Sequence, residues 1–73
     1  VRVYPNPATD FINIAASNIS VVSLFDISGK EINSFTIDGD SRYNVSELKS
    51  DNYFVRVRDL KSQAITTSRI IIK

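Results

Sequence analysis

Residues 19–37 read ISVVSLFDISGKEINSFTI and contain the pattern that decides the fold. β-Branched and aromatic residues dominate both ends of this stretch, residues 19–26 and 31–37, which is typical of β-strands. Between them, residues 27–30 (ISGK) are predicted to form a hairpin turn in which Gly29 adopts a positive φ. Ile32 and Phe35 fall on opposite faces of a regular strand, so we expect a bulge or a strong twist there.

The same alternation of short strands and turns recurs about every eight to twelve residues along the chain. It predicts five further strands, at residues 1–4, 11–16, 42–45, 53–59 and 64–72. Ser46-Glu47-Leu48 allows a single helical turn, and no segment has the periodicity of a longer amphipathic helix. About seven short antiparallel strands in 73 residues predict an all-β fold, a sandwich of immunoglobulin-like type.

The strand at residues 53–59 has a clear inside and outside. Its apolar residues, which include Tyr53 and Val55, alternate with Arg56 and Arg58, so we expect the arginines to face outward. Leu48 lies shortly before Tyr53, an arrangement that resembles a tyrosine corner, in which the phenol hydroxyl bonds to upstream backbone. A plain core aromatic explains Tyr53 equally well.

The composition excludes several classes of site. The chain contains no Cys and no His, which excludes disulfides, thiolate sites, the usual zinc sites and His-dependent catalytic triads. We therefore predict no catalytic activity and no cofactor. The net charge is +1 with Lys and Arg spread along the chain, which indicates solvated strand faces rather than a nucleic-acid-binding surface.

The chain length and hydrophobic content predict one domain, residues 1–73, with a genuine core. No apolar run approaches the ~20 residues that a membrane-spanning helix needs. Because the first residue is Val1 rather than Met, we expect the chain to be part of a longer protein.

Three short motifs are open to a chemical interpretation. Asp38-Gly39-Asp40 is compatible with a calcium site, but two carboxylates are few ligands and Asp-Gly is a common turn. Gly29-Lys30 lacks the other residues of a phosphate-binding loop. Asn18-Ile19-Ser20 and Asn44-Val45-Ser46 match the N-glycosylation pattern, which arises often by chance.

The last predicted strand ends in Ile70-Ile71-Ile72, apolar on both faces, followed by Lys73. A strand that is buried on both sides would explain this run. Alternatively, an extended terminus of high β-propensity offers a receptor a strand to bind, with Lys73 as a charged guard against aggregation.

Four segments, in order along the chain, have a distinctive sequence: 3–10 (VYPNPATD), 22–31 (VSLFDISGKE), 44–57 (NVSELKSDNYFVRV) and 69–73 (RIIIK). Together they resemble the motifs of the type A C-terminal sorting domains of the type IX secretion system, which occur on exported proteins of Bacteroidetes. One departure is Asn52, where the family usually has Gly before the Tyr. Asn tolerates the left-handed conformation better than other non-Gly residues, so we expect that turn to survive.

The resemblance implies a seven-stranded immunoglobulin-like sandwich that follows an N-terminal cargo domain in the same chain. It implies passage through the periplasm, recognition by the outer-membrane translocon, removal by a sortase-like protease in many relatives, and arrival at the cell surface or outside the cell. The residues that we expect to take part in recognition come from all four segments: Pro5, Asn6, Pro7, Asp26, Gly29, Lys30, Tyr53, Ile70, Ile71, Ile72 and Lys73.

The alternative hypothesis is a passive or carbohydrate-binding accessory module of a secreted enzyme or adhesin. It predicts that exposed aromatic residues cluster on one face, and the candidates are Tyr4, Phe25, Tyr43 and Phe54. The absence of Trp weakens this hypothesis, because the indole ring offers a sugar the largest apolar face.

Overall fold

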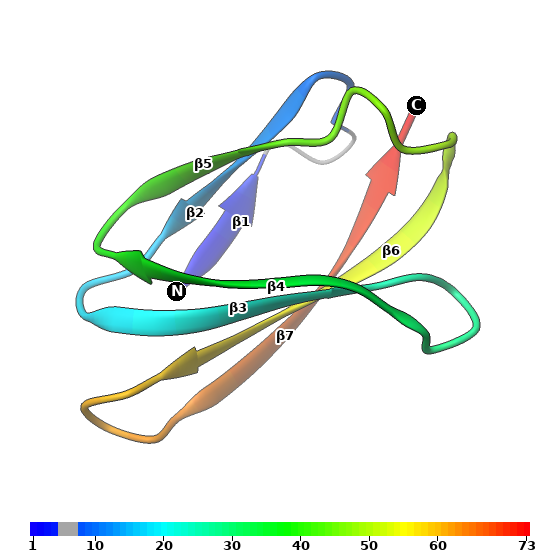
Figure 1. Ribbon diagram of the computed structural model, residues 1–73. Helices are drawn as coiled ribbons and strands as arrows, with labels where there is room; N and C mark the ends of the chain where they lie inside the picture. Colours follow the sequence, from blue (N-terminus) through cyan, green and yellow to red (C-terminus); the bar gives the residue numbers. More distant parts are fainter. Residues whose placement is uncertain (5–7) are drawn as a thin grey trace.

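The computed structural model of the chain describes residues 1–4 and 8–73. These residues form seven strands: β1 (Arg2–Tyr4), β2 (Phe11–Ala15), β3 (Ile19–Phe25), β4 (Glu31–Asp38), β5 (Ser41–Asn44), β6 (Asp51–Asp59) and β7 (Ile65–Ile72). The described part of the chain has no helix that could cross a bilayer. The predicted all-β sandwich is confirmed (Figure 1).

The strands are arranged in two sheets that pack face to face. One sheet has the strand order β1-β2-β5 and the other has the order β4-β3-β6-β7, with antiparallel pairing throughout both sheets. Alternate side chains of each strand point into the space between the sheets. The core there consists of buried apolar residues from both sheets: Ala8, Ile12, Ile14, Ala16, Val22, Leu24, Ile37, Val45, Tyr53, Val55, Val57, Ile70 and Ile72.

The predicted irregularity in the fourth strand is a β-bulge. Leu24 pairs with Asn33 whereas Phe25 pairs with Glu31, so Ile32 is the extra residue of β4. The hairpin that joins β3 to β4 turns at Gly29, whose φ is +89°. Both features confirm what the pattern of residues 19–37 predicted.

The predicted helical turn at Ser46-Glu47-Leu48 is wrong. The segment forms a single hydrogen-bonded turn, in which the Leu48 N–H donates to the Val45 carbonyl at 3.0 Å. The Asn44 side-chain oxygen accepts bonds from the backbone N–H and the hydroxyl of Ser46, at 2.8 and 2.7 Å. Among the described residues no further turn bond follows the one from Leu48 to Val45, so the chain does not continue as a helix.

The interpretation of Ile70-Ile71-Ile72 as a strand buried on both sides is also wrong. Ile70 and Ile72 are 0% and 2% exposed, but Ile71 is 37% exposed. The reason is that β7 lies at the edge of an antiparallel sheet, with one face toward the core and the other toward solvent.

Candidate recognition site

The four motif segments lie toward the same end of the sandwich. The described residues of this motif end, as we call it, are 8–10, 45–50 and 71–73, at the upper right of Figure 1, and 26–30, the β3–β4 hairpin at the right below them. The strand register places them there, because Asp51 pairs with Ile72 and Phe11 pairs with Asn44 at the same end. The opposite far end contains residues 16–18, 38–40 and 60–64.

Main-chain hydrogen bonds connect the first motif segment to the last. The Ala8 N–H donates to the Ile71 carbonyl at 2.8 Å, and the Lys73 N–H donates to the Ala8 carbonyl at 2.9 Å. Ala8 thus forms a parallel bridge with Ile72 and is itself 1% exposed. The Val45 N–H donates to the Asp10 carbonyl at 2.8 Å, which joins the late motif to the same cluster.

The end of the terminal strand has one face buried in the core and one face exposed to solvent. Ile70 and Ile72 lie in the core, and β7 pairs with β6 from Ile65 to Ile72. Ile71 and Lys73 point away from the core and are exposed. Burial of two isoleucine side chains stabilises the strand by about 2 kcal/mol for each residue. A partner that leaves the fold intact can therefore touch Ile71 and Lys73 but not the two buried isoleucines.

Tyr53 is both a core aromatic and a tyrosine corner, so both interpretations of this residue hold. Its ring is 6% exposed, and its hydroxyl donates to the Lys49 carbonyl at 2.8 Å. Burial raises the pKa of the Tyr53 phenol, with a smaller contribution from the negative charges of Asp51 and Asp26. The bond fixes the loop between β5 and β6.

The β3–β4 hairpin is organised by the carboxylate of Asp26. One oxygen accepts the Ser28 hydroxyl at 2.6 Å, the Ser28 N–H at 3.0 Å and the Lys30 N–H at 2.9 Å. The Ser28 hydroxyl and then the Lys30 N–H lower the pKa of Asp26, because they stabilise its charged form. Asp26 and Gly29 thus shape the turn, which leaves the exposed Lys30 and the 62% exposed Ile27 for a partner.

Asn52 does not need the left-handed conformation expected at the family's glycine position. It lies inside β6, and Gln63 is the non-glycine residue with a positive φ in the described ranges. The other predicted recognition residues, Pro5, Asn6 and Pro7, lie outside the described residues.

The segment Asp38-Gly39-Asp40 forms the predicted turn, with a φ of +82° at Gly39. The Asp40 carboxylate accepts the Ala16 N–H at 2.9 Å. Within residues 1–4 and 8–73, no group of three or more acidic side chains is placed to hold a metal ion.

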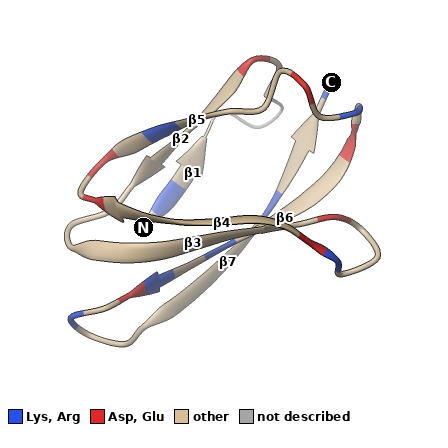
Figure 2. Ribbon diagram, in the orientation of Figure 1, with Lys and Arg blue, Asp and Glu red and all other residues tan. Residues whose placement is uncertain are grey.

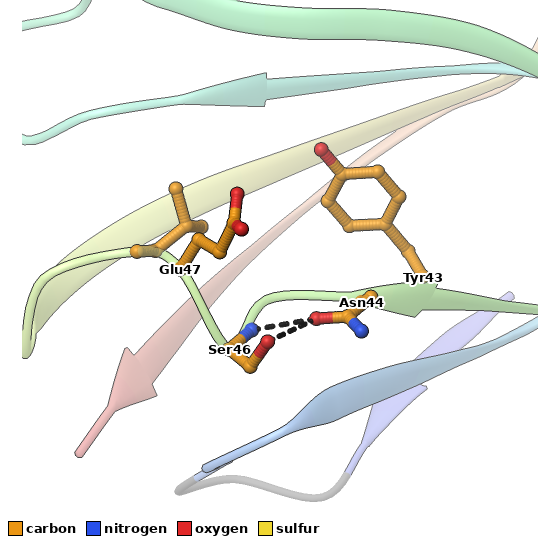
Figure 3. A pocket seen from close by; sticks show the side chains of 5 residues that line it. Tyr43, Asn44, Ser46 and Glu47 are labelled. Carbon is orange, nitrogen blue, oxygen red and sulfur yellow. Dashed lines mark hydrogen bonds between the residues drawn. The ribbon is translucent and has the colours of Figure 1, made fainter.

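The β5–β6 loop borders a pocket of about 350 Å³, which is lined by Tyr43, Asn44, Ser46, Glu47 and Leu48 (Figure 3). The side-chain oxygen of Asn44 in this lining accepts two bonds from Ser46.

The four candidate aromatic residues do not cluster on one face. Tyr43 points inward and stacks on Phe35, with ring centroids 4.7 Å apart. Tyr4 belongs to the three-stranded sheet, whereas Phe25 and Phe54 pair on the outer face of the four-stranded sheet. The arrangement that a sugar-binding platform requires is absent from these four residues.

Comparison with known protein families matches residues 2–73 to the secretion system C-terminal sorting domain. No curated protein and no solved structure matched the chain. The match spans nearly the full length and all four motif segments. Members of the family are sorting signals for type IX secretion: the machinery of that system recognises them, and export leads across the outer membrane to the cell surface or outside. The chain belongs to the family of secretion system C-terminal sorting domains.

Proposed function

We propose that the type IX machinery recognises the motif end of this domain as a folded surface, without any chemical step by the domain itself. The observation that supports this is the main-chain bonding of Ala8 to Ile71 and Lys73. Because backbone groups join these segments, their exposed side chains are not needed to hold them together. Those side chains are therefore available to a receptor.

Within this surface, two groups of residues have different roles. Lys30, Ile71 and Lys73 are exposed and contact the receptor directly. Asp26, Gly29, Tyr53, Ile70 and Ile72 act indirectly, because they set the shape of the hairpin, the loop and the terminal strand. Pro5, Asn6 and Pro7 stiffen the segment that precedes Ala8, since proline fixes φ.

The proposed route follows from this role. The domain, residues 1–73, is a single unit attached to an N-terminal cargo domain. The cargo crosses the inner membrane, passes through the periplasm, and is delivered to the outer-membrane translocon by the folded sorting domain. A sortase-like protease of the same system then removes the domain. No catalysis by the domain is required, and its lack of His and Cys is in keeping with that.

Fusion of residues 1–73 to a periplasmic reporter tests the proposal in a bacterium with a working type IX system. We expect the reporter outside the cell. A deletion of residues 70–73 should abolish export, but it also removes two core isoleucines, so folding must be checked by circular dichroism.

A surface variant separates recognition from folding. Ile71→Ser combined with Lys73→Glu changes the motif end, and Leu60→Ser combined with Lys61→Glu makes the equivalent change at the far end. All four side chains are exposed, so both variants should fold. We expect lost export for the first variant and normal export for the second. A folded wild-type fusion that stays in the periplasm would contradict the proposed function.

A further inference from the structure

Charged residues are distributed unevenly between the strand interiors and the rest of the chain (Figure 2). Every acidic residue lies in a connection or at the first or last position of a strand: Asp10, Asp26, Glu31, Asp38, Asp40, Glu47, Asp51 and Asp59. The lysines all lie outside the strands. The charged residues in strand interiors are arginines only, namely Arg42, Arg56, Arg58 and Arg69.

Three of these arginines share the outer face of the four-stranded sheet. Arg56 pairs with Thr67, Arg58 pairs with Ile65, and Arg69 pairs with Phe54. Cross-strand partners point to the same side of a sheet, and the residues between them, such as Val55 and Val57, lie in the core. We call this outer surface, formed by Phe25, Phe54, Arg56, Arg58, Ile65 and Arg69, the arginine face.

No carboxylate neutralises Arg56 and Arg58, which form the centre of the arginine face. The Arg56 guanidinium lies over the Phe25 ring, 4.9 Å from its centroid. Within the described ranges, neither Arg56 nor Arg58 forms an ion pair. The acidic residues of these strands, such as Glu31 and Asp59, are confined to the strand ends. The result is a positive centre with a partly negative rim.

The arginine face also exposes apolar side chains, which have no use on a surface that contacts only water. Ile65 is 60% exposed, and Phe25 and Phe54 are half-buried between the arginines. Arginine and aromatic residues are enriched at the centres of protein interfaces. Guanidinium groups bind carboxylates in a bidentate way. They are also more weakly hydrated than ammonium groups, so an arginine loses less hydration free energy than a lysine when a partner excludes water.

We propose that the arginine face is a docking surface for an acidic protein surface of the type IX machinery, distinct from the contacts made by the motif end. This inference rests on the proposed function. The acidic rim favours a protein partner over an anionic membrane, because a broad negative plane would meet the rim carboxylates as well as the arginines. A protein can place its carboxylates opposite the positive centre alone.

The test compares two double variants with the same change in charge. Arg56→Gln with Arg58→Gln alters the arginine face, and Arg2→Gln with Arg42→Gln alters the other sheet, where these arginines lie over Tyr4 and Phe11. Each variant lowers the net charge from +1 to −1, since two positive charges are removed. The probes are the purified outer-membrane translocon complex of the type IX system and, separately, vesicles that contain anionic phospholipid.

We expect the arginine-face variant to bind the translocon about tenfold more weakly at low salt, with a flatter dependence on salt concentration. The control variant should stay within about twofold of wild type. Equal affinities of the two variants, or a loss confined to vesicle binding, would overturn the inference while leaving the proposed function intact. If the wild-type chain itself fails to bind the translocon and to export a reporter, the proposed function fails and the inference fails with it.

Discussion

The two ends of the sandwich are fastened by different chemical groups. At the motif end, three backbone bonds join segments that are far apart in the sequence, and they connect Ala8 to Ile71, Lys73 to Ala8, and Val45 to Asp10. The far end has one comparable backbone bond, from the Leu60 N–H to the Ile19 carbonyl at 3.0 Å.

Carboxylates supply the remaining long-range bonds of the far end. Asp40 accepts the Ala16 N–H at 2.9 Å, and Asp59 accepts the Asn18 side-chain amide at 2.9 Å. A backbone bond is available whatever the side chain, whereas a carboxylate bond requires one residue type. Exposed side chains of the motif end can therefore be substituted without loss of the bonds that hold it. Substitution of Asp40 or Asp59 removes a bond that holds the far end.

The largest expected difference between the ends concerns the terminal strand. Ile70→Ala removes a fully buried side chain near the motif end and should lower the free energy of unfolding by about 3 kcal/mol, because it leaves a cavity. Ile65→Ala, toward the far end of the same strand, removes a 60% exposed side chain and should cost less than about 0.5 kcal/mol. Urea unfolding monitored by circular dichroism measures both. An equal loss of unfolding free energy in the two variants would show that the end of β7 is not anchored in the core.

Tyr53→Phe tests a side-chain bond that fixes the β5–β6 loop at the motif end. The variant keeps the buried ring and loses the donor to the Lys49 carbonyl, so we expect a loss of about 1.5 kcal/mol. Since the neutral phenol is the stable form in the fold, wild type should also lose stability as the pH rises above about 10, through the raised pKa of Tyr53. This loss of stability at alkaline pH should be smaller in the Phe variant. An unchanged dependence of stability on pH would contradict the role of Tyr53 as a tyrosine corner.

The two glycines offer a matched pair, one at each end. Gly29 and Gly39 have φ values of +89° and +82°, and a methyl group added at either position would meet no atom within 4 Å. Alanine should therefore cost about 1 kcal/mol at both, from backbone strain alone. Export of the reporter fusion should fall only for Gly29→Ala, because only that turn belongs to the motif end. Equal export of the two variants would count against recognition of the hairpin.

Local pattern was sufficient to predict most of the fold. All seven strands, the Gly29 turn and the bulge at Ile32 follow from alternation and turn chemistry, which act over a few residues. The exposure of Ile71 could not be predicted, because three consecutive isoleucines look the same in an edge strand and a central one. Residues 45–48 form only the one turn bond from Leu48 to Val45, and the local pattern did not indicate that the turn would stop there.

The sequence was less informative about which site residues lie close together in the fold. The sequence singled out Asp26, Tyr53 and Lys73 one by one, and their placement at a common end depends on strand order, which no local pattern encodes. Likewise, Arg56 and Arg58 were predicted to face outward, but their position beside Arg69 requires the pairing of β6 with β7. Ala8 carried no signal at all, since its role comes from main-chain groups that every residue has.

The smallest expected effect is a difference in acid sensitivity between the ends. The pKa of Asp59 is lowered first by the Asn18 amide, which belongs to a distant segment, whereas the pKa of Asp26 is lowered by groups of its own hairpin. Both carboxylates are stabilised when charged, so their contribution to stability is present above about pH 4 and is lost as the pH falls through the lowered values. Asp59→Asn should flatten the decline of melting temperature on acidification below about pH 4 more than Asp26→Asn does.

Hydrogen exchange can locate this acid effect in the fold. On acidification, the amides of Lys61 and Ser62 should lose protection, because both donate to Asp59. The amides of Ala8, Val45 and Lys73 should keep theirs, since their acceptors are backbone carbonyls that do not titrate. Early loss of protection at Ala8 and Lys73 would mean that carboxylates also hold the first and last motif segments together. Its side chains would then be constrained by the fold, and the case for their use in recognition would weaken accordingly.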